Sequence, residues 1–188
     1  MLGTMPSELL PGTPRPAAGF DAPLDMLAAC HERLQRQCRT LRRLPPHVAA
    51  HGADAQAQEA STAVMRYFDR AAVDHHADEE EDLFPALLEA MAGSDAVCLR
   101  DLTTALTQQH RELHAQWQAL RSVLARLAAG EPAALDAAQV EAFVDGNLQH
   151  MAREEAELLP MAARLIDDET LQRIGAAMRR RRGIAPGT

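Results

Sequence analysis

The sequence predicts an all-α protein, and three observations point to that class. Apolar residues make up 47% of the 188-residue chain, while aromatic residues make up only 3%, which leaves little material for β-strands. Glycine is scarce outside the two ends. Four long segments repeat apolar residues at the spacing of an amphipathic helix. Four such helices with short connections predict an up-down-up-down four-helix bundle.

Prolines and glycines crowd the first 20 residues, so we expect an irregular N-terminal arm there. The bundle domain is expected to span residues 21–182, followed by a tail at 183–188. Start and stop residues then divide the domain into four long helices and a short extra C-terminal helix. The expected ranges are Pro23–Leu44, Asp54–Met91, Ser94–Gly130, the segment from Pro132 to Pro160, and Asp168–Arg181.

Caps and prolines fix the expected helix ends. Asp21 is expected to cap the first helix, Ser94 or Asp95 the third, and Asp136 the fourth. Because proline lacks an N–H and clashes one turn back, Pro45-Pro46 should stop the first helix. Pro85 should kink or end the second helix for the same reason, and Gly93 should close its continuation.

The composition also narrows the class of function. The chain carries a formal net charge of −8, which argues against a nucleic-acid partner. Its three cysteines form no CxxC pair, so neither a disulfide framework nor a thiolate zinc site is expected. No signal peptide and no long apolar span is evident, which predicts a cytoplasmic protein without a membrane partner.

One motif, HxxxEExxL(F/L)P, occurs twice in the chain, 75 residues apart. It begins at His75 in the first copy and at His150 in the second. Side chains four residues apart lie on one face of a helix, about one turn from each other. His75 with Glu79, and His150 with Glu154, should therefore each present a nitrogen and an oxygen in the same direction.

Both pairs lie in register with the apolar residues of their helices, so they should face the bundle core. Histidines also lie on the apolar stripes of the first and third helices. Buried carboxylates are costly without a counter-charge, and no inward Lys or Arg is evident to supply one. A pair of metal ions would supply this counter-charge. The predicted metal ligands are His31, His75, Glu79, His110, His114, His150 and Glu154.

This set of ligands favours certain metals. Imidazole and carboxylate without thiolate suit iron, manganese or zinc, and disfavour calcium or a sulfur cluster. Two carboxylates shared by five histidines suit a dinuclear centre in which each carboxylate bridges both ions. With a bridging oxo or hydroxo group, seven such ligands leave one position open for a small molecule.

Residues 20–182 resemble a hemerythrin-like protein of the HHE cation-binding family, on the two motif copies together with His31 and His110. The resemblance implies a hemerythrin-like bundle with a non-haem centre of two iron ions, which Glu79 and Glu154 bridge. Oxygen-carrying hemerythrins place an aspartate five residues after the last histidine. This chain has Glu154 and Glu155 four and five residues on, which argues against reversible oxygen transport.

Two ligand assignments have alternatives. His76 pairs with Glu80 at the same spacing as His75 with Glu79, but adjacent helical positions differ by about 100°. Alignment of the two copies from their prolines selects His75, so His76 is expected to be solvated or to contact a ligand. For the third helix, six ligands without His114 would also form a dinuclear site.

The charged residues around the motif are expected to have two different roles. Glu80 and Glu155 should accept hydrogen bonds from ligand imidazoles. Asp78, Glu81 and Asp82 should form a solvated face, and the four arginines at 179–182 should be solvated near the end of the last helix.

The leading interpretation is a di-iron protein that binds dioxygen or nitric oxide. Oxidative di-iron enzymes use more carboxylate ligands, so five histidines to two glutamates favour binding over catalysis. The alternatives are an enzyme that consumes peroxide or nitric oxide, a protein that donates iron for repair of iron–sulfur clusters, and an iron-storage or structural site. The sequence identifies no protein partner.

Overall fold

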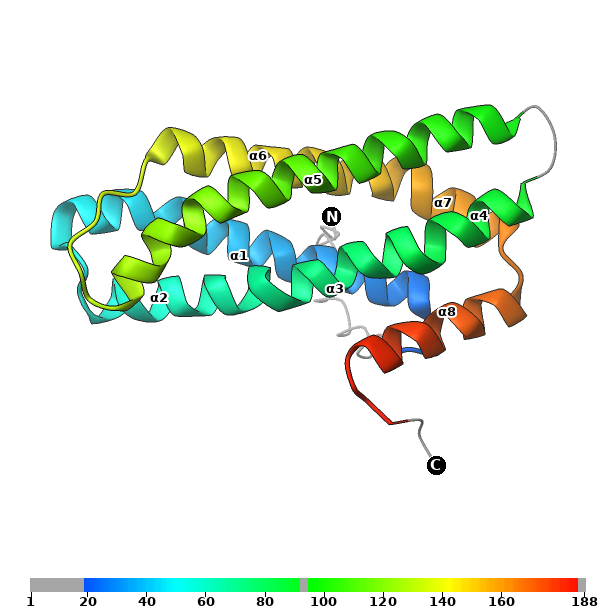
Figure 1. The fold of residues 1–188 in the computed structure, drawn as a ribbon, viewed down its shortest axis with the longest axis horizontal. Helices are drawn as coiled ribbons and strands as arrows, with labels where there is room; N and C mark the ends of the chain where they lie inside the picture. Colours follow the sequence, from blue (N-terminus) through cyan, green and yellow to red (C-terminus); the bar gives the residue numbers. More distant parts are fainter. Residues whose placement is uncertain (1–18, 92–94, 186–188) are drawn as a thin grey trace, which may run out of the picture.

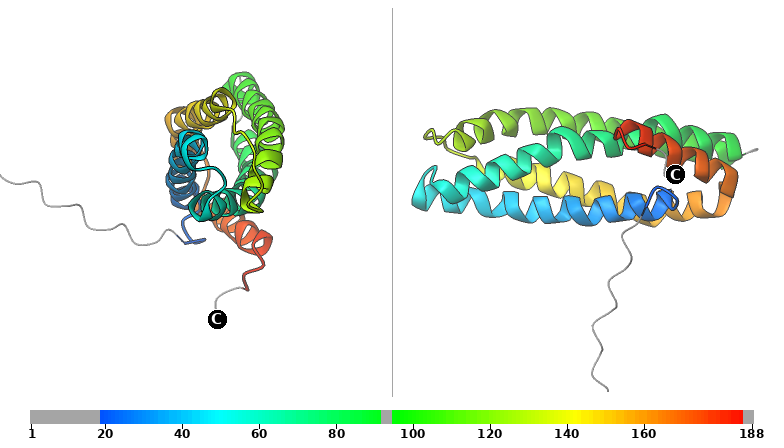
Figure 2. Two further views of the ribbon diagram at one scale, coloured as in Figure 1. Left: turned by 90° about the vertical axis from the view of Figure 1, so that its left-hand side faces the viewer. Right: turned by 90° about the horizontal axis from the view of Figure 1, so that it is seen from below.

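The computed structural model describes residues 19–91 and 95–185, and this part of the chain contains helices and short connections but no β-strand. The all-α class is therefore confirmed for these residues. Four long helical runs lie side by side, and consecutive runs point in opposite directions (Figures 1 and 2). Most of the N-terminal arm, Gly93 and the alternative cap Ser94 lie outside the described residues.

The first run is a single helix, α1 (Pro23–His51), so the predicted stop at Pro45-Pro46 is wrong. Two prolines remove two backbone donors, but their fixed φ is compatible with a helix. Val48 follows them and is buried in the core, which favours continuation. The helix ends where the N–H of Gly52, which has a positive φ, donates to the carbonyl of Val48.

The second run continues through Pro85 because a π-turn precedes the proline. In this turn the N–H of Phe84 donates to the carbonyl of Glu79, five residues back. Pro85 then lies in the first turn of the next helix, where a missing N–H is tolerated. The segments of this run are α2 (Ala55–Arg66), η1 (Tyr67–Ala71), α3 (Ala72–Ala77), η2 (Asp78–Leu83) and α4 (Phe84–Ala90).

The third run is one regular helix, α5 (Asp95–Ala128), and the fourth repeats the π-turn of the second. There the N–H of Leu159 donates to the carbonyl of Glu154, just before Pro160. Both copies of the HxxxEExxL(F/L)P motif therefore contain a π-turn that begins at the inward glutamate or beside it. The segments are α6 (Ala137–Arg153), η3 (Glu154–Leu158) and α7 (Leu159–Leu165).

Three aspartates cap helices through their side chains: Asp54 for α2, Asp136 for α6 and Asp167 for α8 (Asp168–Arg181). The predicted cap Asp21 is wrong, because Ala22 is at the N-cap position of α1 and Asp21 instead accepts a hydrogen bond from Arg179. The short helix α8 lies alongside the bundle and contacts both α1 and η2 (Figures 1 and 2).

The apolar core is divided into two clusters. One, which includes Phe68, Trp117 and Phe143, fills the half nearest the α1–α2 connection. The other, which includes Leu83 and Leu158, fills the half covered by α8. A buried polar layer, mostly of histidine and acidic side chains, lies in the same helices at positions between these clusters. None of the described helices is long and apolar enough to cross a membrane.

Candidate metal centre

All four helical runs contribute side chains to the buried polar layer. The contributing segments are α1, α3 with η2, α5, and α6 with η3, and each of these side chains is at most 3% exposed. In the two motif copies, the i, i+4 spacing presents a histidine and a glutamate together, as the sequence predicted. The side chains are His31, His75, Glu79, His110, His150 and Glu154.

Donor atoms of this layer form two groups of four in which all atoms lie within 4.8 Å of one another. The first group is His31, His75, Glu79 and Glu154, and the second is Glu79, His110, His150 and Glu154. Both carboxylates belong to both groups. Each carboxylate therefore lies between two sets of imidazoles, which is the arrangement that a bridging carboxylate needs.

The two carboxylates lack hydrogen-bond partners. All four oxygens of Glu79 and Glu154 are buried, and none accepts a hydrogen bond from the described residues. The Nε2 atoms of His150 and His31 lie 2.9 and 3.1 Å from oxygens of Glu154, but without hydrogen-bond geometry. An uncompensated buried carboxylate costs several kcal/mol, and a bound cation removes that cost. The residues therefore fit a bound metal cation.

Burial also shifts the pKa of two of these groups. It lowers the pKa of His75 to about 3, so this ring is neutral and keeps the lone pair that a metal ligand needs. Burial raises the pKa of Glu79 to about 8, and the negative charge of Glu154 adds to the increase. A cation between the two carboxylates would favour their ionised forms.

Comparison with known proteins agrees with this geometry. The model of the hemerythrin HHE cation binding domain matches residues 22–162, well over half of the chain. The chain belongs to the hemerythrin HHE family. An uncharacterized protein of Haemophilus influenzae is 33% identical over 171 residues, which are 91% of this chain and 96% of that protein. This hemerythrin-family chain is therefore a helical cation-binding protein.

In this HHE-family chain, three of the histidines are oriented by partners on neighbouring helices. The Nδ1 atom of His31 lies 2.9 Å from Glu155, and that of His110 lies 2.6 Å from Glu80, which confirms the hydrogen bonds predicted for these two glutamates. The Nδ1 atom of His150 lies 2.9 Å from Gln109, which the sequence reasoning missed. Each of these contacts leaves Nε2 facing the carboxylates.

His114 does not lie in this layer. The prediction that it projects inward is wrong: its side chain is exposed and contacts Gln118 on the same helix. The buried positions of α5 follow a three-four spacing that includes His110, Leu113 and Trp117, so position 114 falls outside the inward stripe.

His76, and not His114, is the fifth histidine that lies close to the other predicted ligands. A donor nitrogen of His76 lies within 4.8 Å of donor atoms of His110 and His150, and its ring stacks on the ring of His110 at 3.9 Å. The expectation that His76 is solvated is therefore wrong, while contact with the other ligands is what the structure has. With the partly buried His76, the set of candidate ligands still contains five histidines and two glutamates.

Two charged segments also differ from expectation. Asp78 is fully buried rather than solvated, and it accepts hydrogen bonds from Arg181 and Arg182. Arg181 also donates to Glu81 and Asp82. Two of the four arginines at 179–182 therefore donate hydrogen bonds to the acidic segment that carries Glu79.

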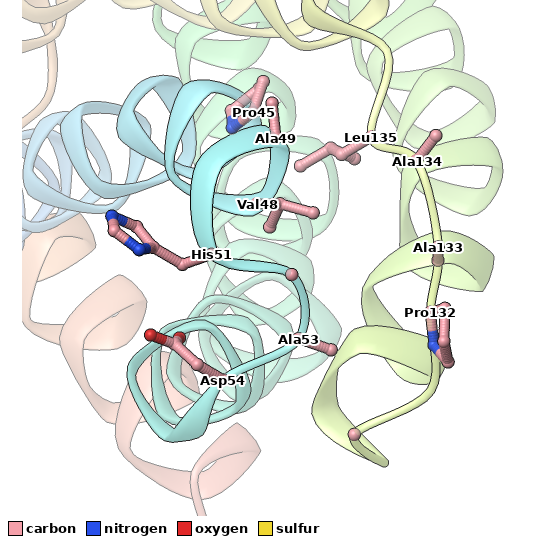
Figure 3. Close-up of a pocket in the computed structure, with 12 residues that line it drawn as sticks. Pro45, Val48, Ala49, His51, Ala53, Asp54, Pro132, Ala133, Ala134 and Leu135 are labelled. Atoms are coloured by element: carbon pink, nitrogen blue, oxygen red, sulfur yellow. The ribbon is translucent and has the colours of Figure 1, made fainter.

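Two cavities differ in their relation to the centre. A surface pocket of about 730 Å³ lies where the α1–α2 and α5–α6 connections meet, lined by Val48, Ala53 and Leu135 among others, and it includes no residue of the two groups (Figure 3). A cavity of about 30 Å³ has His114 and His76 among its lining residues. This second cavity has room for about one water-sized molecule.

Proposed function

We propose that this protein holds two iron ions in a hemerythrin-type up-down-up-down bundle and binds a small diatomic ligand, dioxygen or nitric oxide. The observation that carries the proposal is the pair of buried carboxylates, Glu79 and Glu154, each shared by two groups of imidazoles. Membership of a cation-binding family supports the same reading. Nitrogen and oxygen ligands without thiolate suit iron, and manganese or zinc could replace it.

The number of ligands supports one open position. Two octahedral ions offer twelve places. Five histidines, two bridging carboxylates and one bridging oxo or hydroxo group would occupy eleven of them. Three imidazoles, those of His76, His110 and His150, lie on one side of the carboxylates, and two, those of His31 and His75, lie on the other. We therefore assign the open place to the metal held by His31 and His75.

The protein's own residues would control what occupies that place. Glu80, Glu155 and Gln109 hold three of the rings by their outer nitrogens, which reduces their freedom to rotate. The two apolar clusters on either side exclude bulk water. When bound, the iron pair would supply electrons and a coordination place to the ligand.

A small space also lies beside the centre. The cavity of about 30 Å³ is lined by three aromatic side chains and reaches His76, so it lies on the side of the three imidazoles and not at the assigned open place. It has room for a molecule about the size of water.

Azide titration of the diferric protein tests the proposal. We expect one azide to bind per iron pair, with a new absorption band in the visible range. The exposed variant His114→Ala serves as the control and should bind azide with the same stoichiometry. A second experiment would add nitric oxide to the reduced protein and follow its absorption spectrum.

No uptake of azide at millimolar concentrations by protein that contains two irons would contradict the open position. The centre would then be closed, and an iron-storage or structural role would replace ligand binding. Uptake of two azides per iron pair would mean that one of the five histidines is not a ligand.

A further inference from the structure

Arg181, the last residue of α8, and Arg182, which follows it, enclose an acidic side chain in the wall of the metal centre. Asp78 is 0% exposed, and the guanidinium of Arg182 lies 2.6 Å from its Oδ2 and 3.1 Å from its Oδ1. The Nη1 atom of Arg181 donates to Oδ1 of the same carboxylate. Its second Nη atom lies 2.7 Å from Glu81 and 2.8 Å from Asp82. We call these two arginines and their contacts the arginine clasp.

The helix that carries the clasp is held firmly in place. Gly175 of α8 packs so closely on the backbone of Phe20 that a Cβ atom there would lie 1.9 Å from the carbonyl oxygen. Met178, one turn before the clasp, is fully buried in the apolar cluster beneath. Arg179 lies over the ring of Phe20, 5.4 Å from its centroid. The guanidinium groups are therefore fixed against the bundle before they meet Asp78.

The clasp contacts η2, the π-turn that carries the carboxylate of Glu79. Asp78 and Glu79 are the first two residues of the π-turn η2, in which the carbonyl of Glu79 accepts a hydrogen bond from the N–H of Phe84. A π-turn is a rare alternative to the regular helix, so the surrounding contacts must maintain it. A slip of one residue would rotate Glu79 by about 100°, which would take its carboxylate away from the imidazoles.

The second motif copy is built without a clasp. The residue 75 positions after Asp78 is Arg153, and it forms an ion pair within its own helix, with Glu157 at 3.5 Å. Glu154 also contacts three histidines, at 2.9, 3.1 and 3.8 Å, whereas Glu79 contacts two, at 3.3 and 3.6 Å. Glu79 is thus the carboxylate with fewer imidazole contacts, and its turn is the one with external support.

We propose that Arg181 and Arg182 are positioning residues for the metal centre: through Asp78 they hold η2 in the register that keeps Glu79 between the two groups of imidazoles. The inference rests on the proposed function, because it assumes that Glu79 binds metal. It assigns to α8 a role in metal loading.

Metal binding by the full chain with both arginines replaced, Arg181→Gln with Arg182→Gln, tests the clasp. We expect iron affinity to fall about tenfold or more, the size of effect that outer contacts of metal ligands commonly have. At stoichiometric iron the variant should hold fewer than two ions per chain, and the absorption bands of the bridged pair should weaken. Elemental analysis and optical spectra are the measurements, with circular dichroism to confirm the helical fold.

Two control variants separate positioning from general stability. Arg180→Gln removes an exposed arginine from the same run and should leave iron binding unchanged. Met178→Ala weakens the packing of α8 but keeps the clasp, so it should lower the melting temperature without changing the optical spectrum. If the double variant does not fold, the single variants each keep one guanidinium on Asp78 and should show intermediate iron affinities.

The outcomes distinguish the two claims. A folded double variant that binds two irons with the wild-type spectrum would overturn the clasp and leave the proposed function intact. An equal loss of iron in Met178→Ala would also overturn it, because docking of α8 and not the ion pairs would then be responsible. Wild-type protein that binds no iron would overturn both claims.

Discussion

The sequence predicts His76 beside the inward stripe and His114 on it, but the structure shows the opposite arrangement. His76 contacts His110 and His150, and burial holds its pKa well below the usual range, so the ring is neutral. His114 is exposed. We expect His76→Ala to bind fewer than two irons per chain and His114→Ala to bind two, as measured by elemental analysis. Full iron content in His76→Ala would remove this histidine from the ligand set.

Helical spacing in the sequence predicted most of the buried polar residues, and its failures have a physical cause. The 100° rule assumes a regular helix, but η1 and η2 lie on either side of α3, the short segment that carries His75 and His76. Each π-turn adds a residue and shifts the inward face, so the 100° separation could not decide between the two histidines. The failure at His114 was avoidable, since the three-four spacing of apolar residues in α5 selects Leu113.

At the scale of the elements, the contact between α8 and the segment just before α1 depends on the absence of a side chain at Gly175. Replacement of a glycine by alanine inside a helix usually stabilises it by about 1 kcal/mol. Here the new methyl group would overlap the carbonyl oxygen of Phe20, so we expect Gly175→Ala to lower the free energy of unfolding by roughly 1–3 kcal/mol. Urea denaturation followed by circular dichroism measures the change.

Gly146→Ala is the matched control for this prediction. Its Cβ atom would lie 3.0 Å from the end of the Leu113 side chain, which can move aside. We expect a smaller effect than at Gly175. If Gly175→Ala were as stable as the wild type, α8 would not be packed against Phe20 as described.

Asp69 links η1 to α5 and should make stability depend on pH. Burial alone would raise its pKa, but hydrogen bonds from Arg121 and Trp117 outweigh burial, so the pKa lies below its ordinary value. A lowered pKa in the folded state stabilises the protein above the ordinary pKa, and this stabilisation is lost as the pH falls through the folded value.

Asp69→Asn should therefore be less stable than the wild type at neutral pH, and the difference should shrink below about pH 4. Unfolding curves at several pH values, followed by fluorescence of the single tryptophan Trp117, measure the difference. A difference in stability that stays constant down to pH 2 would show that the Asp69 carboxylate is not ionised in these contacts.

Local signals predicted the cap Asp136, the start of the second run near Asp54 and the range of α8, but they failed at the prolines. Pro45-Pro46 and Pro85 remove backbone donors, which a sequence rule interprets as helix ends. Whether a helix continues depends on burial beyond the proline, as at Val48, and on the π-turn before Pro85. Both are properties of the tertiary structure that local propensity does not contain.

At the scale of the whole molecule, the core depends on a polar layer between two apolar clusters. Glu79 and Glu154 are buried there without hydrogen-bond partners among the described residues. Removal of metal should therefore lower the melting temperature, and excess iron should restore it by mass action. Thermal unfolding before and after chelation measures this change. Equal melting temperatures of the apo and iron-loaded proteins would contradict a metal-dependent core.

Anomalous diffraction at the iron absorption edge, from crystals of the iron-loaded protein, tests the central claim most directly. The account predicts two peaks in the polar layer, separated by about 3.5–4 Å as in other dinuclear sites. One should lie beside His31 and His75, the other beside His110 and His150, with both carboxylates between them. A single peak, or peaks only at the protein surface, would contradict a carboxylate-bridged pair of metal ions.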